Sequence, residues 1–191
     1  HTAHETKEEA DKHVLAILEI YRMIAEEYLA VAVLSGRKSE KEKFAGADYT
    51  TAIEGLMPDG KALQMGTSHQ LGQNFAKAFN ISFLGKDGKH QQPWQTSWGM
   101  STRVIGALIM AHGDDYGLVL PPKIAPIQVV IVPIIFEDSK KEVIAAANKL
   151  KQHLEKEDIA VELDDRESYT AGWKFNDWEL KGVPVRIELG P

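Results

Sequence analysis

The chain has 191 residues, of which 43% are hydrophobic and 26% are charged, so it can bury one good core or two small ones. It contains no cysteine, which excludes disulfides, thiolate catalysis and Cys-based zinc sites. Its formal net charge of −6 argues against a general nucleic-acid binder, although a local patch could still read a few bases.

The ends and the apolar runs of the chain point to a cytoplasmic protein without a membrane segment. No apolar run approaches the ~18 residues of a membrane span. The first six residues have neither a basic end nor an apolar core, so they do not form a signal peptide. His1 and His4 could suggest half of a metal site, but no third ligand accompanies them, and we expect no protein-held metal.

The first third of the chain predicts a long scaffold helix followed by antiparallel strands. Residues 5–29 carry apolar side chains at helical spacing, and Thr6 can cap this helix. Residues 30–34 read as a short strand that Ser35 and Gly36 end. Residues 44–54 and 61–65 read as a strand pair across a turn at residues 57–60.

A cluster of small polar residues, 66–69, then interrupts the strand pattern before residues 71–79 turn helical. Such a cluster with a glycine suits a small-molecule pocket, whereas the alternative is a helix cap by Thr67 or Ser68. Residues 80–95 predict a strand and a hairpin-like excursion.

Residues 96–122 form the most informative stretch, because Arg103 stands at the start of about two and a half turns of almost entirely apolar helix. The pattern predicts a buried helix, in which a guanidinium needs an anionic partner. A phosphate at the helix N-terminus would supply one, and a carboxylate such as Asp114 or Glu54 would do so equally well.

Three prolines between residues 121 and 126 place a domain border, giving domains 1–122 and 123–191. Beyond the border, strand and helix patterns alternate and predict a small, mostly parallel sheet. The strands are residues 127–135, 159–163 and 183–189, and the helices are residues 139–157 and 170–181.

Four segments resemble archaeal/eukaryotic-type prolyl-tRNA synthetases, a family of class II aminoacyl-tRNA synthetases, and they occur in the order that the family has them. The segments are KEKFAGADYTT (41–51), QMGTSHQLGQNF (64–75), SWGMSTRVIGALIMAHGDDYGLVLPP (97–122) and GWKFNDWELKGVP (172–184). The resemblance covers essentially the whole chain.

The resemblance implies an α/β protein: the C-terminal portion of a class II catalytic domain, built on an antiparallel sheet, followed by a truncated anticodon-binding domain. It implies activation of L-proline with ATP and Mg²⁺, transfer of proline to tRNA(Pro), and a homodimer. The first two class II motifs would lie upstream of His1. We therefore expect a fragment, or part of a longer chain, that is inactive alone.

The resemblance also implies the roles of individual residues. The ATP contacts are Gln64, Thr67, Ser101 and Arg103, of which Arg103 is catalytic. The proline pocket is formed by Phe44, His69, Ser97, Trp98 and Gly99. Anticodon guanosines are read by Glu179 and Arg186, which could instead simply pair with Lys181 or Glu188.

Two other functions compete with synthesis: a regulatory or editing paralogue, and a pure tRNA-binding module. Arg103, His69 and Gln64 favour synthetase ancestry over both.

Overall fold

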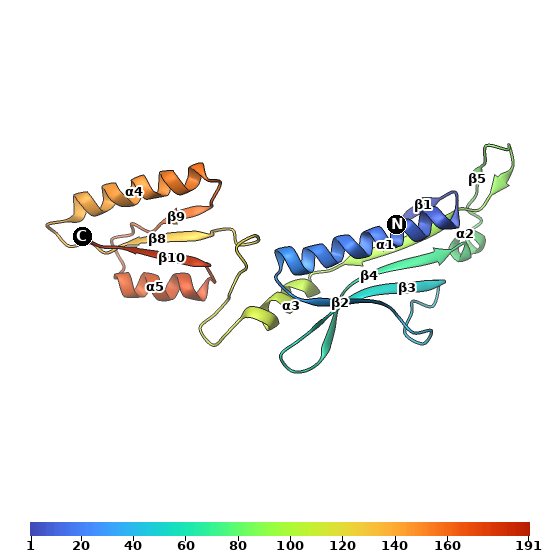
Figure 1. Cartoon of the computed structure of the whole chain (residues 1–191), viewed down its shortest axis with the longest axis horizontal. Coiled ribbons are helices and arrows are strands. Elements are labelled where there is room, and N and C mark those ends of the chain that lie inside the picture. The colour runs from blue at the N-terminus through green and yellow to red at the C-terminus, as the bar shows by residue number, and fades with distance from the viewer. The chain divides into compact units, whose positions relative to one another are not determined.

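The computed structural model describes residues 1–191, and contacts within the chain divide it into two compact units, His1–Ala107 and Leu108–Pro191 (Figure 1). The first unit contains an antiparallel five-stranded sheet and the second a parallel three-stranded sheet, each with helices packed on it. The predicted α/β fold class is confirmed. None of the helices combines the length and apolar composition that a bilayer crossing requires.

The sheet of the first unit has the strand order β1-β7-β4-β3-β2, and every neighbouring pair is antiparallel. Its strands are β1 (Thr2–His4), β2 (Val33–Arg37), β3 (Tyr49–Leu56), β4 (Ala62–Gly72) and β7 (Trp94–Met100). The predicted hairpin of residues 44–65 is present as β3 and β4, joined by the expected turn at Met57–Gly60, where the Gly60 amide donates to the Met57 carbonyl.

Helix α1 (Lys7–Met23) lies along one face of this sheet and continues into a short π-helical segment, η1 (Ile24–Tyr28) (Figure 1). The predicted cap is confirmed, since the Thr6 hydroxyl oxygen accepts from the Glu9 amide at 3.2 Å. The helix buries Ala10, Val14, Ile17 and Tyr21, which recur at helical spacing as the sequence indicated.

Several predicted bounds were wrong. Strand β2 includes Ser35 and Gly36 instead of ending at them. Residues 66–69 do not interrupt a strand but form the middle of β4, because hydrogen bonding to β3 and β7 on both sides holds small polar residues extended there. Neither Thr67 nor Ser68 therefore caps a helix. The helix that follows, α2, is only Asn74–Ala78, and β5 (Phe83–Leu84) pairs with β6 (His90–Gln91).

Helix α3 (Arg103–His112) forms where the apolar pattern predicted it, but it is not the buried helix that we expected. Only Ala107 and Leu108 are buried, while Ile105 and Ile109 are 55% and 46% exposed. An apolar helix needs cover on all sides to be fully buried, and this chain covers only the side of Ala107 and Leu108.

The second unit is built on a sheet of order β10-β8-β9, in which both pairs are parallel, as predicted. Its elements are β8 (Val129–Pro133), α4 (Lys140–Lys156), β9 (Val161–Leu163), α5 (Ala171–Leu180) and β10 (Val185–Leu189). The central strand β8 is buried along its length, with Ile131 packed near Ala147 of α4 and Val130 near Trp178 of α5. The two helices therefore cover opposite faces (Figure 1).

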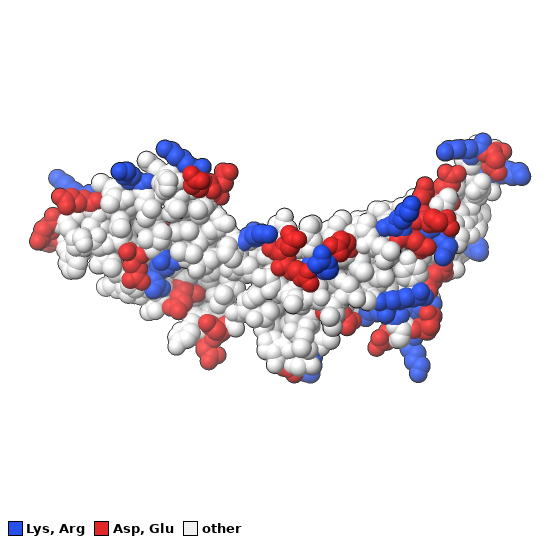
Figure 2. Space-filling model, in the orientation of Figure 1, with Lys and Arg blue, Asp and Glu red and all other residues white.

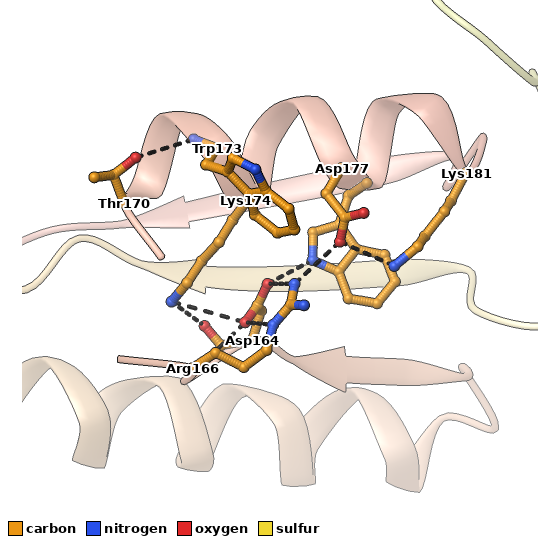
Figure 3. Close-up of polar contacts among 8 residues, drawn as sticks. Asp164, Arg166, Thr170, Trp173, Lys174, Asp177 and Lys181 are labelled. Atoms are coloured by element: carbon orange, nitrogen blue, oxygen red, sulfur yellow. Dashed lines mark hydrogen bonds and ion pairs between the residues drawn. The ribbon is translucent and has the colours of Figure 1, made fainter. Parts of the chain in front are cut away.

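A buried polar cluster ties the end of β9 to α5 (Figure 3). Asp164, whose side chain is fully buried, accepts from Trp178 Nε1 at 2.8 Å and from Arg166 Nε and Nη2 at 2.8 and 2.7 Å. The buried Lys174 donates to the Asp164 carbonyl at 2.9 Å, and its Nζ lies 3.7 Å from the carboxylate. Arg166 also reaches Asp177. Burial alone would raise the pKa of Asp164, but the bonds from Arg166 and Trp178 outweigh it and hold the pKa well below its usual range.

The segment before β8 is attached to the turn that ends α5. The Leu118 amide donates to the Leu180 carbonyl and the Leu120 amide to the Gly182 carbonyl, both at 3.2 Å. Gly182 has a φ of +73°, and a Cβ there would lie 2.6 Å from the Leu118 oxygen. Only glycine allows this turn and this close approach together.

Candidate functional site

The two faces of the first sheet differ in what covers them. Gln70 Nε2 in β4 donates to Asp11 of α1 at 2.8 Å, and Gly66 leaves room for the Tyr21 ring, which a Cβ would approach to 2.9 Å. Helix α1 therefore covers the face of β4 that carries residues 66 and 70. Because side chains alternate along a strand, Thr67 and His69 project from the opposite face.

The uncovered face brings together residues from β4, β7 and the start of α3. Register pairs Thr67 with Gly99 and His69 with Ser97, and directly paired residues share a face. All four predicted ATP contacts line one groove of about 240 Å³, which also includes Gly99. The groove residues are Gln64, Met65, Gly66, Thr67, Gly99, Met100, Ser101 and Arg103.

Arg103 stands exposed at the start of α3. Its Nη1 donates to the Gln64 carbonyl at 3.3 Å, and its backbone amide donates to the Ser101 hydroxyl oxygen at 3.3 Å. The two carboxylates that the sequence offered as alternative partners of Arg103 have other partners. Glu54 lies 3.4 Å from Lys38 Nζ, and Asp114 accepts from the backbone amides of its own turn. A guanidinium without a carboxylate partner at a helix N-terminus favours an anion in the groove.

Phe44 and His69 face each other with ring centroids 5.5 Å apart. A cavity of about 350 Å³ adjoins Phe44 and Ser97, and its remaining wall is mostly apolar. His69 Nδ1 lies 2.8 Å from the Thr50 hydroxyl oxygen. Burial, and then the positive charge of Lys38, lower the pKa of His69, so the ring is neutral at pH 7. The site combines aromatic walls with a few polar groups, as small-ligand pockets do.

Trp98 is not brought together with the other predicted proline-pocket residues. It pairs with Ser68 and lies with it on the face that α1 covers, where its ring centroid is 6.0 Å from that of His13. Ser97, Trp98 and Gly99 are consecutive in β7, so the three residues cannot all face the same side of the sheet. The structure thus contradicts the expected contact of Trp98 with the pocket.

Glu179 and Arg186 line one cavity of about 200 Å³ in the second unit, together with Val130, Trp178, Val183 and Pro184. Arg186 Nη2 lies 2.8 Å from Glu188 Oε1, so the surface pairing that competed with base reading is present. Lys181 pairs with Asp177, not with Glu179. Figure 2 shows acidic and basic side chains intermingled on the face drawn, without one broad basic patch. On the face drawn, a nucleic-acid contact would therefore be local.

Residues 1–112 match the family model described as tRNA synthetase class II core domain (G, H, P, S and T), which covers more than half of the chain. The chain belongs to this family. Residues 128–191 match a second model, the Anticodon binding domain. The two parts of the class II chain thus correspond to the antiparallel and parallel sheets, and the predicted border after residue 122 falls between the matched ranges.

Several curated proteins that are similar to this class II chain are named proline--tRNA ligases. This chain is 58% identical to a "Proline--tRNA ligase" of Cenarchaeum symbiosum (strain A) and 59% identical to one of Chlorobaculum tepidum. It is 56% identical to the "Proline--tRNA ligase, chloroplastic/mitochondrial" of Arabidopsis thaliana. Each alignment covers 100% of this chain but only 40%, 40% and 35% of the relative. The chain spans about two fifths of the length of the first two relatives.

Sequence reasoning missed Thr50, which contacts two residues of the candidate site. Thr50 is 1% exposed, and its hydroxyl contacts both Phe44 and His69. Its sequence neighbours gave no signal, because Thr50 and Thr51 look equivalent and only the strand pairing with β4 distinguishes them.

Proposed function

We propose that this chain is the part of a prolyl-tRNA synthetase that holds ATP and proline and begins the anticodon-binding domain. The observation that best supports this proposal is that one groove is lined by all four proposed ATP contacts, Gln64, Thr67, Ser101 and Arg103. The groove lies on the sheet face that also bears His69 and Ser97. The name shared by relatives at 56–59% identity supports proline as the amino acid.

In the proposed reaction, a carboxylate oxygen of L-proline attacks the α-phosphate of ATP and displaces pyrophosphate. Arg103 is the residue of this chain placed to neutralise phosphate charge, and Gln64 and Thr67 orient the nucleotide from β4. The terminal hydroxyl of tRNA(Pro) then attacks the prolyl carbonyl carbon, and AMP leaves. No side-chain nucleophile is needed, because positioning and charge neutralisation supply the catalysis.

Phe44 and His69, with Ser97 and Gly99, are proposed to bind proline. The Phe44 ring suits the small apolar ring of proline, while His69 and Ser97 offer polar contacts to its carboxylate. Trp98 has no part in this pocket because it lies on the covered face.

The residues described do not fit a protein-held metal site. No group of three or more His, Asp or Glu side chains is placed to hold a metal ion, and no carboxylate lines the Arg103 groove. Mg²⁺ is proposed to enter on the phosphates of ATP, which is how this ion commonly reaches nucleotide sites.

The second unit is proposed to bind the anticodon of tRNA(Pro), with Glu179 and Arg186 reading its guanosines. An arginine can form two bonds to guanine O6 and N7, and a carboxylate can accept from guanine N–H groups. Arg186 would exchange its Glu188 partner for the base. A homodimer, a cytoplasmic location and the domain border after residue 122 stay predictions.

Binding of a non-hydrolysable prolyl-adenylate analogue, measured by calorimetry, tests the proposal. The protein should bind the prolyl analogue more tightly than the alanyl analogue, and Arg103→Ala should weaken both. Arg22→Ala is the matched control, since Arg22 pairs with Glu19 and Glu26 on α1. Equal affinity for the prolyl and alanyl analogues would refute the assignment of proline.

A further inference from the structure

Thr50 connects two of the residues proposed to bind proline. It lies in β3 with 1% of its surface exposed. Its hydroxyl oxygen accepts from the Phe44 backbone amide at 3.1 Å and lies 2.8 Å from His69 Nδ1. One buried hydroxyl therefore fixes the loop that carries Phe44 and the imidazole that faces it.

The positions of the hydrogens follow from what each group can donate. The Phe44 amide can only donate, so the Thr50 oxygen is the acceptor in that bond. The hydroxyl hydrogen of a buried threonine also requires an acceptor, because leaving it unpaired is costly. His69 Nδ1 is the acceptor that the Thr50 side chain contacts, so the hydroxyl donates to Nδ1.

A ring nitrogen that accepts a hydrogen bond carries no proton, which leaves the proton of the neutral ring on Nε2. His69 Nε2 makes no hydrogen bond within the chain. Its N–H is therefore available on the sheet face that carries Ser97, where a carboxylate or carbonyl oxygen could accept from it. Burial lowers the pKa of His69 and keeps the ring neutral, in agreement with a single N–H.

We propose that Thr50 is a positioning residue of the amino-acid pocket: its hydroxyl holds His69 as the Nε2–H tautomer, aimed at a carboxylate or carbonyl oxygen, and anchors Phe44. The part that concerns proline rests on the function proposed above. The tautomer itself does not, since it follows from the hydrogen bonds of Thr50 alone.

The tautomer is tested first, by long-range ¹H–¹⁵N correlation spectra of the histidines in this chain at pH 7.5, with His69→Asn used to assign the ring. We expect His69 Nδ1 to show the shift of an unprotonated nitrogen and Nε2 that of a protonated one. A protonated Nδ1 in the unsubstituted protein would overturn the proposal without any variant.

Two substitutions separate the hydroxyl from the shape of the side chain. Thr50→Val keeps the shape and removes the hydroxyl, so the His69 nitrogens should shift toward a mixture of tautomers. Thr50→Ser keeps the hydroxyl and should retain the unsubstituted spectrum. An unchanged tautomer in a folded Thr50→Val protein would also refute the role of Thr50.

The functional arm uses a full-length protein that contains this chain and measures proline-dependent pyrophosphate exchange. Thr50→Val should raise KM for proline roughly tenfold, the loss of one oriented hydrogen bond, with KM for ATP unchanged, and Thr50→Ser should stay near the unsubstituted value. Equal increases in both KM values would overturn the positioning role. If the unsubstituted protein did not activate proline, the proposed function would be refuted, whereas the tautomer assignment would still stand.

Discussion

Replacing Asp164 with Asn should destabilise the second unit far more than the same change at its exposed neighbour Asp165. The substitution keeps the shape of the side chain, and the amide oxygen can still accept from Trp178 Nε1. It removes the negative charge that faces Arg166 and Lys174. Removing one partner of a buried ion pair typically costs about 3–5 kcal/mol.

The geometry places the cost near the lower end of that range. The Arg166 side chain is 38% exposed and can turn toward water. The Lys174 side chain is 4% exposed and cannot, although it keeps its bond to the Asp164 carbonyl. We therefore expect a loss of about 3 kcal/mol, or roughly a 10²-fold change in the unfolding equilibrium.

Hydrogen exchange measured peptide by peptide reports the stability of each of the two units separately. In Asp164→Asn, exchange of the β8 amides should accelerate by about 10²-fold, while β4 should be unchanged. Asp165→Asn is the matched control, since it removes the same charge from an exposed neighbour. Equal β8 exchange in the two variants would show that the buried carboxylate contributes nothing.

The same carboxylate predicts a pH dependence with a definite sign. An unfolded aspartate has a pKa of about 3.9, and the pKa of Asp164 in the folded state lies well below that. Between these two values the unfolded state binds a proton that the folded state does not, so the stabilisation is present above about pH 4 and is lost as the pH falls. Asp164→Asn should lack this component of acid unfolding.

Three further predictions concern the sites, in a full-length protein that contains this chain. Arg103→Ala should lower the rate of proline activation by about 10²–10³ in pyrophosphate exchange, with tRNA binding little changed, and an unchanged rate would make Arg103 structural. His69→Ala should weaken proline binding more than ATP binding, and calorimetry showing equal losses would count against its pocket role. Arg186→Ala should lose about 1–3 kcal/mol of discrimination against guanosine-substituted tRNA(Pro) in charging assays, whereas undiminished rejection would show that Arg186 is not a reader.

The second unit was the most predictable part of the fold. The β-branched run of residues 127–135 predicts a strand covered on both faces, and β8 is buried in that way. The helix predicted for residues 170–181 is present as α5, and the Thr170 hydroxyl oxygen caps it by accepting from the Trp173 amide. Local propensity and tertiary packing agree in these elements.

The first unit shows where sequence patterns stop being informative. Residues 66–69 look like a break because Gly66 has low strand propensity and no apolar residue follows before position 71, yet hydrogen bonding on both sides keeps β4 continuous. The burial of α3 was misjudged because an apolar sequence cannot show how many of its sides are covered.

The candidate site, too, was only partly predictable from the sequence. The motif resemblance gave the proposed ATP contacts, and all four of these residues line one groove. It also grouped Ser97, Trp98 and Gly99, although alternation along a strand separates the middle residue from the other two. Thr50 could not be found from the sequence, because its role depends on register with a strand about twenty residues later.

The attachment of residues 118–120 to the end of α5 has a practical consequence for dissecting the protein. A cut at the prolines would remove the Leu118 and Leu120 amides and strip the Leu180 and Gly182 carbonyls of their donors beside Glu179. An isolated anticodon-binding fragment should therefore start at or before Gly117, so that the turn next to Glu179 keeps these two hydrogen bonds. Shorter versions are expected to fray at that turn and to be clipped there first by proteases.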